Sequence, residues 1–181
     1  MMVDIVIESL IHAEQVPAAL AGSVVPDRPG YYSIWIDNPV NLPRSYANRL
    51  QEDKTNLIYV GIATKSLLKR LVEQDLHHKS PSTFFRGIGP ILGYRPPKGS
   101  LAGKSNQNNY KFTKDDTASI IGWIESHLSV RVVEESPALA DIEAGVIRKL
   151  RPLLNGTHNP ASLDELAQLR KECREIAQST V

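Results

Sequence analysis

Residues 30–36 have the sequence GYYSIWI, and residues 57–61 have the sequence LIYVG. Both runs are rich in β-branched and aromatic side chains, which favour the pleated backbone of a strand. Pro29 precedes the first run and Pro39 closely follows it, and prolines of this kind often bound strands. We therefore predict strands over about 30–37 and about 56–61. If these strands pair antiparallel, residues 38–55 must form the connection between them.

Apolar periodicity and turn-forming residues predict the remaining elements. A third strand of alternating character is expected over about 129–134. Residues 93–109 are expected to form a long loop, because Gly, Pro, Ser and Asn recur there. Residues 3–22 are expected to form a strand or short helix that packs on the main domain. Helices are predicted over about 44–52, 66–78, 82–93, 114–127, 137–151 and 162–178.

Three of these helices carry a capping signal at their start. Thr113 precedes an acidic residue at the spacing of an N-terminal cap, Ser136 stands directly before a proline, and Ser162 opens a capping box. Side-chain oxygens at such positions accept hydrogen bonds from the first free amides of a helix. We therefore expect Thr113, Ser136 and Ser162 to cap the helices that follow them.

These elements predict an α+β fold with a small three-stranded, mostly antiparallel sheet flanked by helices. A doubly wound parallel sheet is not favoured, because only three strands are convincing. We expect one domain over residues 1–181. Within it, about 1–28 would be an N-terminal extension, about 29–160 the core and about 161–181 a C-terminal helix.

Length and composition favour an intracellular globular protein. With 181 residues, 41% of them hydrophobic, the chain can bury a core in one domain. No apolar run approaches the ~18 residues of a membrane span, and the first residues lack the pattern of a signal peptide. The chain has one cysteine, Cys173, so it can form no internal disulfide. We therefore expect a cytoplasmic protein that does not associate with a membrane.

The charge distribution leaves two interpretations open. The chain has 21 basic and 20 acidic residues, a net charge of +1, whereas nucleic-acid-binding proteins usually present a basic face. However, no Asp or Glu interrupts the stretch from Lys79 to Lys114. This stretch is either a surface for a phosphate backbone or a solvated, loop-rich insertion. Its basic residues are Lys79, Arg86, Arg95, Lys98, Lys104, Lys111 and Lys114.

Glu143 is an acidic residue within an apolar helix face. At about 100° per residue, Glu143 falls on the same arc as Leu139, Ile142, Val146, Ile147 and Leu150. Glutamate is rarely buried unless it is paired or binds a metal. Glu143 is therefore a candidate metal ligand. The alternatives are an ion pair with Arg148 or Arg151, or a side chain that extends to the edge of the face.

Arg70 and two strand tyrosines are further candidates. In a helix over about 66–78, Arg70 lies opposite the apolar face, on the same side as Gln74 and His77. A planar, permanently charged guanidinium suits a phosphate oxygen, although a solvated arginine on an amphipathic helix is the simpler interpretation. Tyr32 and Tyr59 become neighbours if their strands pair antiparallel, although ordinary aromatic packing is the simpler interpretation of either tyrosine alone.

The order of these residues resembles the GIY-YIG nuclease superfamily. In that family Gly-x-Tyr opens the first strand and Tyr-x-Gly closes the second, as at Gly30–Tyr32 and Tyr59–Gly61. An arginine follows in the next helix, here Arg70. The most specific part of the likeness is the segment from Glu143 through Pro152 to Asn155, which is similar to the family's E-x(n)-P-x-x-N pattern. The likeness spans about 29–160 and indicates a bacterial stand-alone member.

The resemblance implies a metal-dependent endonuclease that hydrolyses phosphodiester bonds of nucleic acid, with DNA favoured. Glu143 would hold one Mg²⁺ or Mn²⁺, and Arg70 would offset charge on the phosphoryl oxygens. Tyr59 or Tyr32 would orient or deprotonate the attacking water, and Asn155 would hold the site together by hydrogen bonds. The catalytic set is Tyr32, Tyr59, Arg70, Glu143 and Asn155, and the expected substrate-binding residues are His77, Lys98, Lys104 and Lys111.

Three departures from the family pattern leave a second function open. The connection between Tyr32 and Tyr59 is longer than usual, and Gln74 stands where many members have a histidine, for which His77 or His78 would be the substitute. No separate DNA-binding domain is visible in the sequence. The alternative is therefore a non-catalytic module that binds nucleic acid or protein and keeps the fold without turnover.

Overall fold

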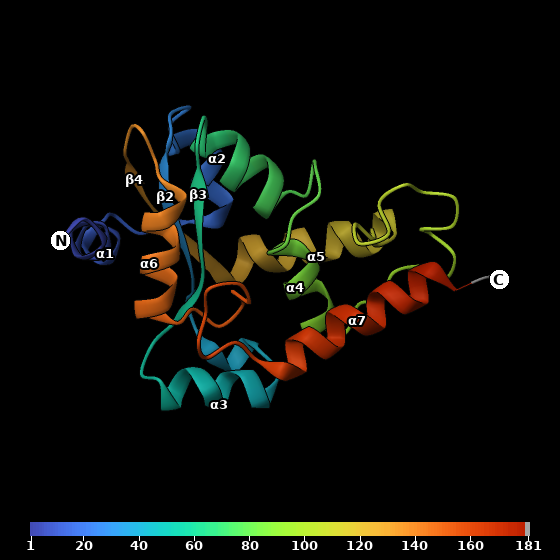
Figure 1. Cartoon of the computed structure of the whole chain (residues 1–181). Helices are drawn as coiled ribbons and strands as arrows, with labels where there is room; N and C mark the ends of the chain where they lie inside the picture. Colours follow the sequence, from blue (N-terminus) through green and yellow to red (C-terminus); the bar gives the residue numbers. More distant parts are fainter. Residues whose placement is uncertain (180–181) are drawn as a thin grey trace.

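The computed structural model describes residues 1–179 and has a four-stranded antiparallel sheet with helices on both faces (Figure 1). The strands are β1 (Val16–Pro17), β2 (Gly30–Ile36), β3 (Leu57–Ala63) and β4 (Leu128–Glu134), in the spatial order β1-β4-β2-β3. The predicted α+β class is confirmed, as is the antiparallel pairing of the two motif strands. Within residues 1–179, no helix has the length and apolar character that a membrane span requires.

The predicted number of strands was wrong, because β1 was missed. This strand has two residues, with Val16 opposite Val130 and Pro17 opposite Ser129. Two residues are too few to display an alternating pattern, and proline is usually a sign against a strand. Pro17 is tolerated because β1 is the edge strand, where a missing N–H removes no bond within the sheet.

Two glycines allow the close packing around β2. Tyr32 lies opposite Gly61 in the β2–β3 ladder, and a Cβ added to Gly61 would come within 2.3 Å of the Tyr32 ring and hydroxyl. A Cβ added to Gly30 would lie 2.2 Å from the carbonyl oxygen of Val133. The glycines of both motifs are therefore required by close approach rather than by turn formation.

The helices divide between the two faces of the sheet (Figure 1). On one face, Tyr31 and Val60 pack with residues of α1 and α6. On the other, Tyr32, Ile34 and Ile58 pack with residues of η3, α4, α5 and α7. Successive residues of β2 thus enter two separate cores. The helices are α1 (Met2–His12), α2 (Ala21–Val24), α3 (Arg44–Glu52), η3 (Leu68–Leu76), α4 (Phe85–Ile91), α5 (Lys114–His127), α6 (Ala140–Leu150) and α7 (Asp164–Gln178), with short 3₁₀ turns η1 (Ala18–Leu20) and η2 (Pro39–Asn41).

Of the three predicted caps, one is confirmed. Thr113 Oγ1 accepts a hydrogen bond of 3.0 Å from the Asp116 amide at the start of α5. The cap of α6 is Leu139, and that of α7 is Leu163, neither with a side-chain bond, so the expectation for Ser136 and Ser162 was wrong. At the start of α6 the hydrogen bond comes from a residue distant in sequence instead of from a local cap, because the Leu139 amide donates to Tyr31 Oη at 2.7 Å.

The helix after β3 is wound as a π-helix, whereas the sequence predicted ordinary α-helical winding. At its end the His77 amide bonds to the Val72 carbonyl, five residues earlier, at 3.0 Å. Each turn therefore holds close to one residue more than in an α-helix. Such winding is rare and is often found at functional sites. It changes which side chains of Leu68–Leu76 lie above one another.

Candidate active site

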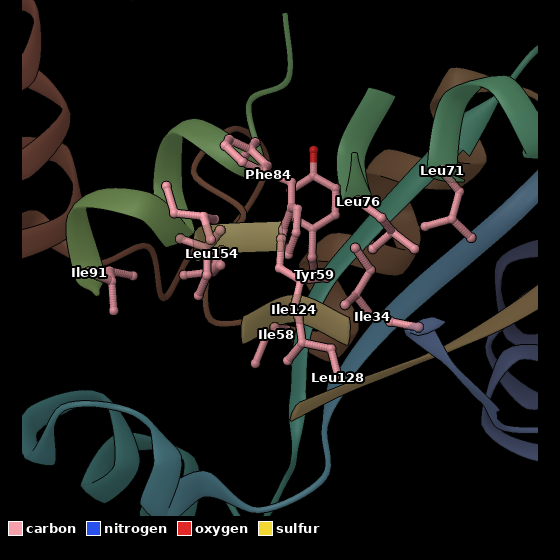
Figure 2. Close-up of a cluster of buried hydrophobic side chains, with 14 of the residues drawn as sticks. Ile34, Ile58, Tyr59, Leu71, Leu76, Phe84, Ile91, Ile124, Leu128 and Leu154 are labelled. Atoms are coloured by element: carbon pink, nitrogen blue, oxygen red, sulfur yellow. The ribbon is translucent and has the colours of Figure 1, made fainter. Parts of the chain in front are cut away.

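The two motif tyrosines lie side by side on one face of the sheet. The ring centroids of Tyr32 and Tyr59 are 6.4 Å apart, and that of Phe84 is 5.3 Å from Tyr59. Tyr32 is fully buried and Tyr59 is 6% exposed. Figure 2 shows the hydroxyl oxygen of Tyr59 pointing away from the aliphatic side chains around its ring. The Tyr59 hydroxyl has no hydrogen-bond partner among residues 1–179, so it is free to bind a water or a substrate oxygen.

Asp75, which was not among the predicted site residues, is the centre of a buried polar cluster. Its carboxylate accepts hydrogen bonds from the Tyr32 hydroxyl, from Arg70 Nη1 at 2.7 Å and from Ser82 Oγ at 2.7 Å. The Asp75 side chain is fully buried, and that of Arg70 is 30% exposed. Buried carboxylates need such donors, because an unpaired charge in the interior is costly. Asp75 thereby fixes Tyr32 and Arg70 in place.

The π-winding brings Arg70 and Asp75 together. In an α-helix, residues five apart lie about 140° apart around the axis, so Arg70 and Asp75 would point in different directions. When the turn is longer, the fifth residue comes closer to alignment with the first. A signal for Asp75 was present nonetheless: at about 100° per residue it falls between Leu68 and Leu71 on the apolar face, as Glu143 does on its own helix.

Burial keeps both tyrosines in their neutral form. Burial is the main cause that raises the pKa of Tyr32 well above its ordinary value, and the Asp75 carboxylate adds to the effect. The pKa of Tyr59 is also raised, mainly by burial and then by Asp75, while Arg70 opposes the shift. Neither phenol can act as a proton acceptor at neutral pH in this state. Because the Tyr32 hydroxyl is engaged by Asp75, Tyr59 is the one available to orient a water.

Glu143 is partly buried and forms no ion pair among residues 1–179. The alternative that it pairs with Arg148 or Arg151 is not observed, and both arginines are exposed. Burial raises the pKa of the Glu143 carboxyl, nearby Asp75 raises it further, and Arg70 and the Ile62 amide lower it. Glu143 therefore lies close enough to Arg70 and Asp75 for both charges to shift its pKa. No side-chain partner among residues 1–179 neutralises the charge of Glu143 itself.

The donor set at Glu143 fits a hydrated hard cation. Within residues 1–179, no group of three or more His, Cys, Asp or Glu side chains could enclose a metal ion. One carboxylate, with waters and a substrate phosphate as the other ligands, is sufficient for Mg²⁺, which retains several of its waters. A transition metal that requires several nitrogen or sulfur ligands would not fit.

A groove of about 620 Å³ lies beside the cluster. Its wall includes Ile62, whose amide is next to Glu143, as well as Arg70, Lys65 and Lys69. A fourth cation in the wall, Lys79, is paired with Glu73 at 3.1 Å. The groove is therefore predominantly basic, as a surface that binds a phosphate backbone would be, and Arg70 is part of its wall.

Asn155 holds the chain after α6 against the outer edge of β3. Its Oδ1 accepts from the Val60 amide and its Nδ2 donates to the Val60 carbonyl, both at 2.9 Å. Asn159 in turn donates to the Asn155 carbonyl at 2.9 Å. Asn155 is 7% exposed, and its amide group is occupied by the backbone of the strand that carries Tyr59. Its contacts are those of a positioning residue.

We expect Asn155→Ala to lower the free energy of unfolding by about 2–3 kcal/mol, because two buried backbone groups of Val60 lose their partners. Urea denaturation would measure the loss. The matched control is Asn48→Ala, since Asn48 is exposed on α3 and its side chain makes no hydrogen bond among residues 1–179; its effect should stay within about 0.5 kcal/mol. A loss at Asn155 no larger than at Asn48 would contradict this role.

The expected substrate-binding residues do not line the groove beside Arg70. His77 pairs with Glu125 of α5 at 3.2 Å and is not among the residues that line the groove with Arg70. Lys104 and Lys111 line a separate hollow of about 370 Å³, and Lys98 is exposed outside it. Gln74 lines the groove but donates its side-chain amide to the Pro81 carbonyl.

Comparison with known proteins identifies one family. A family model described as the GIY-YIG catalytic domain matches residues 30–174. The match covers more than half of the chain, begins at the first glycine of β2 and ends within α7. It therefore includes every residue of the site described above. Searches of curated proteins and of solved structures each give no significant match.

Proposed function

Because the chain belongs to the GIY-YIG catalytic domain family, we propose that it is a metal-dependent endonuclease that hydrolyses phosphodiester bonds, with DNA as the favoured substrate. Membership implies a nuclease-type activity and a nucleic-acid substrate. One observation supports catalysis most directly. Glu143 is a partly buried carboxylate without a side-chain partner in residues 1–179, and it lies near Arg70 and Tyr59. A binding module would have no need to keep such a charge unpaired.

Glu143 is the residue proposed to hold a divalent cation, Mg²⁺ or Mn²⁺. Such an ion, when bound, polarises the phosphate and stabilises the leaving oxygen. Burial raises the pKa of the Glu143 carboxyl and so disfavours its ionised form. A cation bound beside the carboxylate would act in the opposite direction and favour the ionised form. The neighbouring Ile62 amide, at the wall of the groove, restricts where the carboxylate can point.

Arg70 is proposed to bind a non-bridging oxygen of the scissile phosphate. Its Nη1 is held by Asp75 at 2.7 Å, which leaves the rest of the guanidinium to face the groove that it lines. A guanidinium fixed at one end is already oriented, so it can stabilise charge that develops on the phosphoryl oxygens without reorganisation. Lysine at this position would retain charge but could not bridge Asp75 and phosphate in the same way.

Tyr59 is proposed to position the attacking water through its free hydroxyl. The neutral phenol can accept a hydrogen bond from water and can donate one to a phosphate oxygen. Tyr32 acts indirectly, since its hydroxyl is bonded to Asp75 and so supports the orientation of Arg70. Asn155 acts through the backbone of β3 on the placement of Tyr59.

We expect the purified protein to nick supercoiled plasmid or to cut branched DNA in Mg²⁺ or Mn²⁺, and to be inactive in EDTA. Cleavage is measured by gel electrophoresis, with a structured RNA as a second substrate class. The Glu143→Ala variant, purified identically, excludes a contaminating nuclease if it is inactive. RNA cleavage alone would overturn the preference for DNA. Binding without cleavage of any substrate would favour the non-catalytic module instead.

A further inference from the structure

Three arginines meet in a second pocket, on the far side of the segment that follows η3. The pocket has a volume of about 210 Å³. Arg86 comes from α4, whereas Arg170 and Arg174 come from successive turns of α7. No acidic residue is among the side chains that line it, which are Thr83, Arg86, Asn108, Tyr110, Arg170 and Arg174.

Internal contacts hold two of these arginines in place and leave donors unused. Arg170 Nη2 donates to the carbonyls of Thr83 and Leu154, each at 3.2 Å, while its Nε is buried without a partner in residues 1–179. Gly87 provides the space, because a Cβ there would come 2.7 Å from Arg170 Nη2. Arg86 Nη1 is fixed by Asn109 Oδ1 at 2.6 Å.

Arg174 differs from these two arginines in having no partner among the residues that the structure describes. Its side chain forms no hydrogen bond and no ion pair among residues 1–179, although it lines the pocket and is partly buried. The other arginines on these helices are bonded to carbonyl oxygens or to a side-chain amide. The guanidinium of Arg174 is therefore the one with all its donors available to a ligand.

The pocket holds concentrated positive charge that nothing in its wall neutralises. The pKa of Arg170 is lowered by burial and by the charges of Arg86 and Arg174, and that of Arg86 is lowered by burial and by Arg174. Burial raises the pKa of Tyr110, whose hydroxyl donates to the Arg86 carbonyl, so this phenol stays neutral. Like charges held this close repel one another, and a bound anion would relieve that repulsion.

We propose that this pocket binds a phosphate group of the nucleic-acid backbone, away from the phosphate that is cleaved. The inference extends the proposed function, on which it rests for the identity of the ligand. Planar guanidinium groups suit phosphate oxygens, and three of them on two helices would fix its position rather than attract it diffusely. The pocket thus determines which backbone position reaches Glu143 and Arg70.

Contacts connect the pocket to the candidate active site and to the basic loop. Ser82 bonds to Asp75, Phe84 packs on Tyr59, and Thr83 lines the pocket, so one short segment touches both sites. On the other side, Asn108 lines the pocket while Asn109 lines the hollow of Lys104 and Lys111. A backbone that leaves the groove can therefore pass the arginines and continue toward those lysines.

Equilibrium binding of a fluorescent DNA duplex in EDTA, measured by anisotropy over a series of salt concentrations, tests this inference. We expect Arg174→Gln to weaken binding about tenfold. The slope of log affinity against log salt should become less steep by about one, which is the change expected when one phosphate contact is lost. Lys171→Gln is the matched control. It removes one positive charge from the same helix, but Lys171 is exposed and faces Glu175. The control should change affinity less than about twofold.

Duplexes with one uncharged methylphosphonate linkage locate the contact. Wild type should lose affinity at one linkage position, and Arg174→Gln should be insensitive to that same position. Equal effects of Arg174→Gln and Lys171→Gln, or an unchanged methylphosphonate profile in Arg174→Gln, would overturn the pocket. If wild type binds through Arg174 but cleaves nothing in Mg²⁺ or Mn²⁺, the pocket stands and the proposed nuclease fails. If wild type cleaves but Arg174→Gln binds as tightly as wild type does, the proposed nuclease stands and the pocket fails.

Discussion

Glu143→Gln is expected to reduce metal-dependent cleavage by about a hundred-fold or more, as loss of a group that stabilises developing charge commonly does. Glutamine keeps the length of the side chain and an oxygen that can face the Ile62 amide, but it has no charge to attract a divalent cation. The rate constant is measured with enzyme in excess over plasmid, so that binding does not limit it. Raising the Mn²⁺ concentration should recover little of the lost rate.

The same substitution should affect stability in opposite directions with and without metal. Because burial raises the pKa of Glu143 above its ordinary value of 4.5, the folded state holds the proton more tightly than the unfolded state. Stability therefore falls as pH rises from 4.5 through the raised pKa. Without metal at pH 7, Glu143→Gln should melt slightly above wild type. With Mg²⁺ or Mn²⁺, only wild type should gain melting temperature, and the gain should increase with pH.

Asp141→Asn is the matched control for both measurements. Asp141 lies in the first turn of the same helix, is exposed, and carries the same charge. Its substitution should leave cleavage within about twofold, since an exposed charge is screened by water and salt. The ion must bind elsewhere if Glu143→Gln keeps more than about a tenth of the wild-type cleavage rate. The same conclusion follows if the variant retains the metal-dependent gain in melting temperature.

The sequence was sufficient to predict the parts of the fold that depend on local pattern. Runs rich in aromatic and β-branched residues predicted β2 and β3, whose antiparallel pairing places Tyr32 opposite Gly61. The predicted helices over 44–52 and 114–127 coincide with α3 and α5. Each has a periodic pattern and a clear boundary, so tertiary contacts had little to change.

Features that depend on tertiary contact were missed. The two residues of β1 form a strand only because β4 offers them a partner. The start of α6 is set by the Tyr31 hydroxyl rather than by Ser136. The arginine pocket combines α4 with α7, which are distant in sequence, and three separate arginines carry no local signal. Local periodicity contains no information about such long-range neighbours.

Asp75 differs from these cases, because the pattern did place a carboxylate among apolar residues of its helix. What the pattern could not supply was the π-winding, and without it Arg70 and Asp75 belong to different faces. The winding allows one buried carboxylate to hold Arg70, Tyr32 and Ser82 at once. The orientation of the candidate catalytic arginine therefore depends on a residue that does not touch the groove.

Asp75→Ala is expected to lower the free energy of unfolding by about 3 kcal/mol, because it leaves a guanidinium and two hydroxyls without their shared acceptor. The value is at the lower end of the range for a broken buried pair, since Arg70 is 30% exposed and can turn toward water. Urea denaturation measures the loss. Ser82→Ala removes one neutral donor from the same carboxylate and should cost about 1 kcal/mol.

Cleavage by the folded fraction of Asp75→Asn separates orientation from stability. Asparagine nearly preserves the shape but cannot accept from Arg70 with the strength of a carboxylate, so Arg70 should lose its fixed orientation. We expect a cleavage rate about tenfold or more below wild type at a temperature where circular dichroism shows the variant folded. Arg70→Ala should then cost little more in the Asp75→Asn background than Asp75→Asn costs alone, because both act through one guanidinium. Additive losses would mean that Asp75 supports the fold without positioning Arg70.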